Sequence, residues 1–222
     1  MKESSADWQV LLQRATLGEQ EALAQLFDQF RGRLRRMIHV RLDRRVQARV
    51  SPSDVLQEAF LDLARRIHEY AQLADYPFFL WLRQLVGQRL IDIHRQHLGA
   101  QMRSAELEVS LTSGLAPSAS ALSLAGLLVD RLGTASQVAE VRETQATVQT
   151  ALQKLAADDR EILAMRHFEM LTNGEAAHLL GITAGAASKR YVRALLRVRQ
   201  ELSAHPDFRE LFGTSADPTA EG

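Results

Sequence analysis

The chain has 222 residues, enough for one large domain or two small ones, and its 46% hydrophobic and 24% charged residues are typical of a globular protein. It contains no cysteine, which excludes disulfides, thiolate catalysis and cysteine-based zinc sites. No apolar run approaches the ~20 residues that span a bilayer, and the N-terminus lacks a signal-like pattern. We therefore expect a cytoplasmic protein with no membrane insertion.

Helical periodicity dominates the first hundred residues. Apolar residues between Trp8 and Leu42 recur at spacings of three and four, and no alternating run of Val, Ile, Thr and Tyr indicates a strand. We therefore predict an all-α protein. Although the net charge is zero, basic residues gather locally: eight arginines lie between Arg31 and Arg49, opposed there only by Asp43. Such clusters favour binding to a polyanion.

A helix is predicted to begin after Ser51, because this N-cap residue is followed by Pro52 and by Asp54 in the first turn. Asp54, Gln57 and Glu58 then share one side of the helix. Three interpretations of this side are open: a solvated surface, an acidic catalytic pair, or a docking surface for a basic partner. A catalytic pair needs a cleft with two distinct environments, and the sequence indicates none.

Pro77 interrupts the pattern, and another helix is predicted from about residue 79 to 98. His94 and His97 lie one turn apart on it, a spacing compatible with metal binding. Without a third ligand, contact with phosphate is the better interpretation. Phe79 and Trp81 have two interpretations, stacking on a nucleic-acid base or packing in the core.

The composition changes over residues 100–134, where Ser, Ala and Gly accompany Pro117. This composition predicts a flexible linker, within which "ALSLAGLLVDRLG" could form a short helix. We therefore predict two small helical domains, residues 1–99 and 135–205, followed by a disordered tail over 206–222.

The second domain has the local pattern of a helix-turn-helix. Asp158 and Thr172 are each followed three residues later by Glu, the spacing of a capping box, so each is predicted to cap a helix. Gly181 suits a left-handed turn, and Thr183 is predicted to cap the longer helix that follows. One face of that helix is basic and suited to the major groove. The alternative is an ordinary helical hairpin with a solvated face.

Three stretches, in this order, resemble the bacterial extracytoplasmic-function sigma factors, the promoter-recognition subunits of RNA polymerase. "SDVLQEAFLDLAR" is similar to the family's second-region helix. "FFLWLRQLVGQRLIDIHRQH" is similar to the adjoining DNA-facing helix. "LAADDREILAMRHFEMLTNGEAAHLLGITAGAASKRYVRALLRVR" is similar to the C-terminal helix-turn-helix domain. The long linker resembles that of a recognised subgroup.

The resemblance implies a non-enzymatic protein without cofactors that binds core RNA polymerase and directs promoter recognition, DNA melting and initiation. Its implied partners are the clamp coiled-coil and flap regions of core polymerase, promoter DNA and, as in many members, an anti-sigma protein. The implied polymerase-binding residues are Asp54, Gln57, Glu58 and Leu61. The candidates for minus-ten DNA are Arg83, Gln84, Gln88, Asp92 and Arg95, with the loop of residues 71–76. The candidates for minus-thirty-five DNA are Thr183, Ser188, Lys189, Arg190, Arg193 and Arg197.

Two departures from the family pattern affect the DNA-reading helices. Gly87 and Gln88 stand where a basic or small residue and asparagine are common, and Ser188 and Lys189 reverse a frequent Lys-Ser order. Two other functions are compatible with parts of the sequence. A stand-alone helix-turn-helix regulator of operator DNA would leave the motifs of the first domain without a role. A helical hydrolase would use the acidic and histidine side chains.

Overall fold

The computed structural model describes residues 7–73, 76–98, 116–132, 138–205 and 208. Across these ranges the chain forms helices and turns without a strand, which confirms the all-α prediction. The contacts divide the chain into two compact units, one of residues 1–118 with 168–170 and one of residues 119–167 with 171–222. Among the helices described, none is long and apolar enough to cross a membrane.

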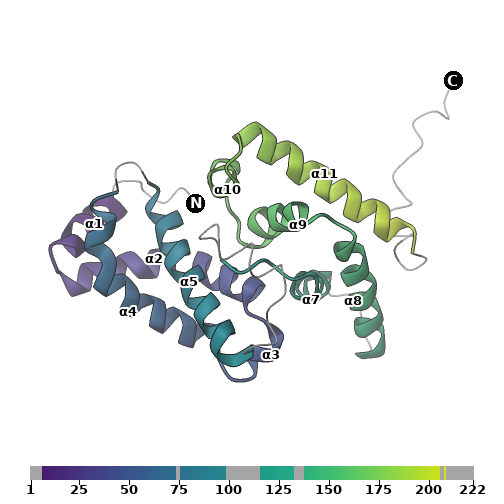
Figure 1. Ribbon diagram of the computed structural model, residues 1–222, viewed down its shortest axis with the longest axis horizontal. Coiled ribbons are helices and arrows are strands. Elements are labelled where there is room, and N and C mark those ends of the chain that lie inside the picture. Colours follow the sequence, from purple (N-terminus) through teal and green to yellow (C-terminus); the bar gives the residue numbers. More distant parts are fainter. Residues whose placement is uncertain (1–6, 74–75, 99–115, 133–137, 206–207, 209–222) are drawn as a thin grey trace. The chain divides into compact units, whose positions relative to one another are not determined.

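Four long helices pack together in the first unit. Helices α1 and α2 lie side by side, and α4 packs against both α2 and α5 (Figure 1). Leu26, Leu34 and Leu63 are fully buried between them. The helices of this unit are α1 (Asp7–Thr16), α2 (Gln20–Arg41), the short α3 (Arg44–Gln47), α4 (Pro52–Tyr70) and α5 (Phe78–Leu98).

The start of α4 is capped as the sequence predicts. The Ser51 hydroxyl accepts a hydrogen bond from the backbone N–H of Asp54 at 3.2 Å. In return, Asp54 Oδ2 accepts from the Ser51 backbone N–H at 2.8 Å, and Pro52 occupies the first turn. These reciprocal bonds satisfy backbone donors that a helix N-terminus otherwise leaves without partners.

An aromatic cluster fills one end of this unit. The ring of Phe78 lies 5.5 Å from that of Phe30 and 5.0 Å from that of Tyr70, measured between centroids. Phe79 and Trp81 are both buried, and the guanidinium of Arg33 lies 3.5 Å from the centroid of the Phe79 ring. In this structure both aromatic residues belong to the core, so neither ring is exposed for stacking on a base.

Gly87 lies in the middle of α5, where the backbone of another segment comes unusually close. A Cβ atom at this position would stand 2.9 Å from both Cα and Cβ of Ala116. Such a distance is too short for two carbon atoms, so the close approach requires glycine. Pro117 follows in the same segment, and its carbonyl accepts a hydrogen bond from Arg41 Nη1 at 2.6 Å.

The second unit contains the helix-turn-helix. Its helices are α7 (Ala121–Leu132), α8 (Val138–Gln153), α9 (Ala157–Leu163), α10 (Asn173–Leu180) and α11 (Ala184–Ser203). Helix α7 packs on α8, while α9 and α10 both pack on α11. Helix α7 lies within the range expected as a linker. Residues 100–115, 133 and 134 of that range lie outside the described residues. The expected tail of residues 206–222 also lies outside them, apart from residue 208.

Local signals placed the helix-turn-helix correctly, with one exception. Thr172 and Glu175 form a capping box, and Gly181 adopts the left-handed conformation with a φ of 63°. Thr183 caps α11 by accepting a hydrogen bond from the N–H of Ala186. The prediction that Asp158 caps a helix is wrong, because α9 begins at Ala157 and leaves the Asp158 carboxylate free to reach another helix.

Candidate functional site

The exposed side of α4 carries all four residues predicted to bind the polymerase. Asp54, Gln57, Glu58 and Leu61 are each exposed, and almost half of the Leu61 surface, 48%, is accessible. Glu58 lies 3.5 Å from Arg89 of α5. The α4 surface therefore offers acceptors together with an apolar contact, which is suited to a basic and partly apolar partner.

A groove runs beside this surface between α2 and α4. Its volume is about 820 Å³, and Gln57 is the one residue of the predicted polymerase-binding set that lines it. Apolar side chains such as Phe27 and Leu56 form its floor, with Asp28 and Arg31 among its polar lining. The groove therefore combines an apolar floor with charged groups of both signs.

Asp54, one of the predicted polymerase-binding residues, also belongs to the cap of α4. Hydrogen bonds from the backbone N–H and the hydroxyl of Ser51 hold its pKa below the usual value for an aspartate. The side chain is thus ionised and fixed. A substitution of Asp54 would alter the helix start as well as the surface, which makes Gln57 and Glu58 better probes of docking.

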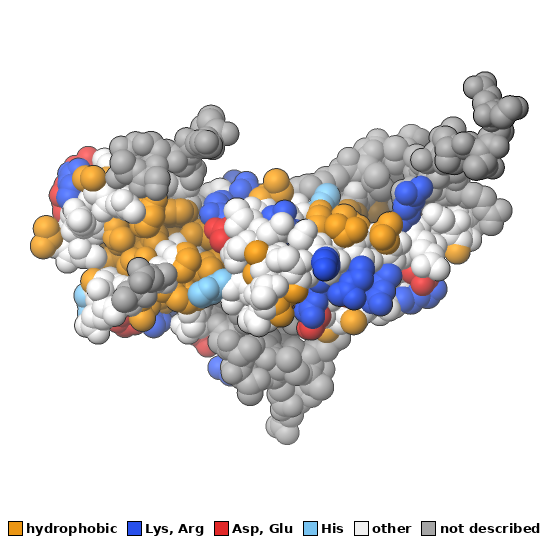
Figure 2. Space-filling view, turned by 90° about the horizontal axis from the view of Figure 1, so that it is seen from above, with side chains coloured by type: hydrophobic (Ala, Val, Ile, Leu, Met, Phe, Trp, Pro, Cys, Tyr) orange, Lys and Arg blue, Asp and Glu red, His pale blue; other side chains and the backbone are white. Residues whose placement is uncertain are grey.

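The exposed side of α11 is basic. Figure 2 shows a stripe of Lys and Arg side chains on the second unit, beside exposed hydrophobic side chains. Lys189 and Arg193 are exposed, and Ser188 is half-buried. Thr183 stands at the start of the helix, where its hydroxyl is already engaged in the cap. The six candidates for minus-thirty-five DNA are Thr183, Ser188, Lys189, Arg190, Arg193 and Arg197, and all lie on this one helix and its cap.

Two of these arginines are held by carboxylates of α9. Arg190 Nη1 lies 3.0 Å from Asp158 Oδ2, and Arg197 Nη1 lies 2.5 Å from Asp159 Oδ2. Tyr191, also on α11, is half-buried beside Arg166, whose guanidinium carbon is 5.6 Å from the ring centroid. Arg190 and Arg197 are therefore both paired with acidic side chains of α9, although Arg197 is also exposed.

Four of the five candidates for minus-ten DNA share one side of α5. Gln84, Gln88, Asp92 and Arg95 follow one another at spacings of three and four residues. Gln88 Oε1 accepts a hydrogen bond from Arg66 Nη1 at 3.1 Å, and Asp92 pairs with Arg95 at 3.8 Å. In the predicted loop before α5, residues 74 and 75 lie outside the described ranges.

Arg83 is placed differently from the other four candidates. Its side chain is only 1% exposed, and its Nε donates a hydrogen bond to Glu169 Oε2 at 2.9 Å. Arg41 donates to the other oxygen of the same carboxylate at 2.7 Å. The prediction that Arg83 contacts DNA is therefore not supported by the structure, because its guanidinium is buried in an ion pair.

The buried carboxylate of Glu169 is ionised. Burial alone would raise its pKa, but the charges and hydrogen bonds of Arg41 and Arg83 outweigh that effect and lower the pKa to about 2. The segment Phe168–Met170 belongs to the first unit by its contacts. A carboxylate and two guanidinium groups thus form a compact charged cluster inside that unit.

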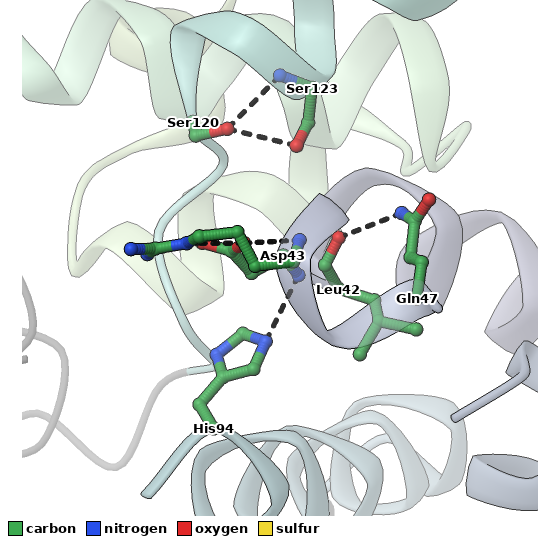
Figure 3. Close-up of polar contacts among 7 residues, drawn as sticks. Leu42, Asp43, Gln47, His94, Ser120 and Ser123 are labelled. Carbon is green, nitrogen blue, oxygen red and sulfur yellow. Dashed lines mark hydrogen bonds and ion pairs between the residues drawn. The ribbon is translucent and has the colours of Figure 1, made fainter. Parts of the chain in front are cut away.

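His94 is also buried, which corrects its interpretation as a phosphate contact. Its Nε2 accepts a hydrogen bond from the backbone N–H of Asp43 at 3.1 Å (Figure 3). This nitrogen therefore carries no proton. Burial lowers the pKa of His94, the nearby Asp43 raises it and Arg45 lowers it, with a net decrease. Among the described residues, no cluster of three His, Asp or Glu side chains could hold a metal ion.

Sequence reasoning missed the acidic partners of the arginines. The sequence pattern marks none of Glu169, Asp158 and Asp159 as a functional residue. One signal was available: Arg83 lies in the apolar sequence "FFLWLRQLV", and an arginine in such a run requires a carboxylate if it is buried. The identity of that carboxylate was not readable, because Glu169 is 86 residues away.

Comparisons with known proteins agree with this architecture. Residues 151–200 match the family model of sigma-70 region 4. A probable RNA polymerase sigma factor of Xanthomonas campestris pv. campestris, RfaY, is 30% identical over 149 residues, which are 67% of this chain and 33% of RfaY. The ECF RNA polymerase sigma factor BldN of Streptomyces coelicolor is 26% identical over 198 residues, covering 87% of this chain and 66% of BldN. This chain thus spans about a third of RfaY and about two thirds of BldN.

A solved structure shows the same fold. CnrH, in a structure described as its complex with the cytosolic domain of CnrY, matches 90% of this chain and 99% of its own with a TM-score of 0.54 and 20% identity. The described residues form two all-α units, and the second contains the sigma-70 region 4 helix-turn-helix with its basic α11 surface. Residues 151–200 thus carry a sigma-70 region 4 domain, and proteins similar to longer stretches of the chain are RNA polymerase sigma factors, one of them of the extracytoplasmic-function class.

Proposed function

We propose that this protein is an alternative sigma factor that binds core RNA polymerase and directs promoter recognition, DNA melting and transcription initiation. The observation that carries the proposal is the basic face of α11 within a segment matched by sigma-70 region 4. Because sigma factors lend specificity to another enzyme, the chain itself needs no catalytic residue or cofactor. It would act in the cytoplasm, where the polymerase transcribes.

The proposed roles follow the two parts of the chain. Residues 1–99 would dock on the polymerase clamp coiled-coil through the exposed side of α4 and read the minus-ten element with Gln84, Gln88, Asp92 and Arg95. Residues 135–205 would read the minus-thirty-five element with α11 and contact the flap region. Residues 100–134 would connect these parts, and an anti-sigma protein is a further proposed partner.

A basic helix in the major groove accounts for the minus-thirty-five role in physical terms. Exposed Lys189 and Arg193 can neutralise phosphates, which supplies affinity without sequence information. Arginine can also donate two hydrogen bonds to guanine, which supplies specificity. The relatives are named sigma factors, so they do not favour the alternative of a stand-alone regulator.

In vitro transcription with purified core polymerase on a genomic fragment library tests the proposal directly. The protein should direct initiation from a small set of fragments, and those fragments should share two sequence elements. Failure to direct any initiation, together with failure to co-purify with core polymerase, would refute it. Symmetric binding to operator DNA as a dimer would instead support the stand-alone regulator.

Docking can be tested with a double variant of α4. Gln57→Ala with Glu58→Ala should weaken binding to core polymerase without changing the circular dichroism spectrum, because both side chains are exposed. Glu143→Ala, at an exposed position of α8, serves as the control. Equal polymerase affinity of the double variant and the control would show that α4 does not form the docking surface.

A further inference from the structure

The α11 surface contains an arrangement that simple phosphate binding does not require. Asp158 and Asp159 are consecutive residues in the first turn of α9, and each holds a different arginine of α11. Arg190 and Arg197 are seven residues apart, about two helical turns, so they lie on the same side of α11. Two adjacent carboxylates therefore orient two cations along one stripe of the helix.

The degree of burial differs between the two pairs. The Asp159 side chain is 12% exposed, while its partner Arg197 reaches into solvent. In the other pair, Arg190 is 25% exposed and Asp158 is largely exposed. Because α9 packs directly on α11, the two carboxylates are attached to the same framework as the arginines. Each arginine is thus restrained by a carboxylate of α9 while part of its side chain stays exposed.

The chemistry of arginine allows a restrained guanidinium to bind a second group. Arg190 uses Nη1 for the bond to Asp158, and a guanidinium has five N–H donors in a fixed plane. The remaining donors can still form a bidentate contact with a base edge. A restrained side chain also loses less conformational entropy on binding, and the nearby carboxylate offsets part of its attraction to phosphate.

We propose that Asp158 is a positioning residue that orients Arg190 for base recognition and reduces sequence-independent binding to DNA, and that Asp159 has the same role for Arg197. The inference rests on the proposed function, since it concerns how the same α11 surface reads DNA. It assigns specificity to acidic residues outside the helix-turn-helix, which would themselves be repelled by phosphate. The two carboxylates act by orienting the arginines and do not contact a base themselves.

The first experiment measures base preference. Full-length protein in complex with core polymerase selects from a pool of duplex DNA carrying a randomised window, and the bound fraction is sequenced. Arg190→Ala should lose preference at one base position. Asp158→Asn should reduce preference at that same position by about two- to fivefold, since an exposed ion pair contributes up to about fivefold to an equilibrium constant. The double variant should show no further loss beyond Arg190→Ala.

The second experiment separates positioning from a general change in charge. Binding of the full-length protein to one fixed non-promoter duplex is measured over a range of salt concentrations. Asp158→Asn should bind this duplex more tightly and show a salt slope steeper by about one, because one more cation becomes available to phosphate. Glu143→Gln removes a negative charge from exposed α8 and should change neither the slope nor the base preference.

The outcomes distinguish this inference from the proposed function. An unchanged base preference in Asp158→Asn, or a change at a position other than the one lost in Arg190→Ala, would overturn the positioning role. An equal effect of Glu143→Gln would reduce the result to net charge and would overturn it as well. If the wild-type complex with polymerase shows no base preference at all, the proposed function fails together with the inference.

Discussion

Arg83 Nε and Glu169 Oε2 lie 2.9 Å apart, and both side chains are only 1% exposed. Arg41 approaches the same carboxylate and is itself buried, so two buried guanidinium groups share one carboxylate. Removing both charged partners from water costs several kcal/mol, which only close and complementary geometry can offset. The cluster therefore makes the first unit sensitive to the loss of any one member.

Glu169→Ala should lower the free energy of unfolding by about 3–5 kcal/mol, because it leaves two buried cations without their carboxylate. The measurement is urea denaturation followed by circular dichroism. Glu19→Ala, which removes an exposed partner of Arg14, should change stability little. A loss in Glu169→Ala as small as that of the control would mean that the carboxylate is not needed inside the unit.

Acid should remove the contribution of Glu169 in a defined range. Its folded-state pKa of about 2 lies below the ordinary value of 4.5, so its stabilisation is fully present above pH 4.5 and is lost as the pH falls toward 2. The difference in unfolding free energy between wild type and Glu169→Gln should therefore shrink over this range. Comparison with the variant removes the contribution of other carboxylates. A difference that stays constant down to pH 2 would contradict the assignment.

Gly87→Ala should destabilise the protein, although glycine is normally unfavourable inside a helix. The new Cβ would meet the backbone of Ala116 at 2.9 Å, and that segment would have to move. Gly32→Ala is the matched control in α2, because the nearest atom to its new Cβ is a flexible arginine end at 4.0 Å. That variant should gain about 1 kcal/mol from helix propensity. Equal gains in thermal unfolding experiments would rule out the close approach.

His94 should titrate below the ordinary value of a free histidine. Burial disfavours its charged form, and protonation of Nε2 would remove the acceptor for the Asp43 backbone N–H. Its stabilising contribution is therefore present above the ordinary pKa of 6.5 and is lost as the pH falls from 6.5 through the lower pKa of the folded state. NMR titration of the ring protons, assigned with His94→Ala, checks this. A pKa at or above 6.5 would show that the ring is not held neutral.

Local signals in the sequence predicted most of the helices and their caps. Ser51 and Asp54, Thr172 and Glu175, and Gly181 each act through residues at most four positions away, so pattern alone is sufficient to identify them. The exposed sides of α4 and α11 follow in turn from helical periodicity. The all-α fold and the character of these surfaces were therefore predictable.

The partners of charged residues were not predictable in the same way. Asp158 has the spacing of a capping residue, but its carboxylate binds Arg190, 32 residues further along the chain. His94 has the spacing of a surface ligand, yet the amide of Asp43, 51 residues away, makes it a buried acceptor. In both cases tertiary packing decides between two roles that a single helix permits equally.

The cap of α4 also affects the free energy with which a partner would bind to this helix. Both hydrogen bonds from Ser51 go to Oδ2 of Asp54 and hold the side chain in place. The second carboxylate oxygen, Oδ1, is then the atom that can accept a bond from a partner. A basic partner would therefore meet a preorganised acceptor, and little rotational freedom remains to be lost on contact. In the proposed docking of α4, the two-residue motif that begins the helix would thus also present a preorganised acceptor to the partner.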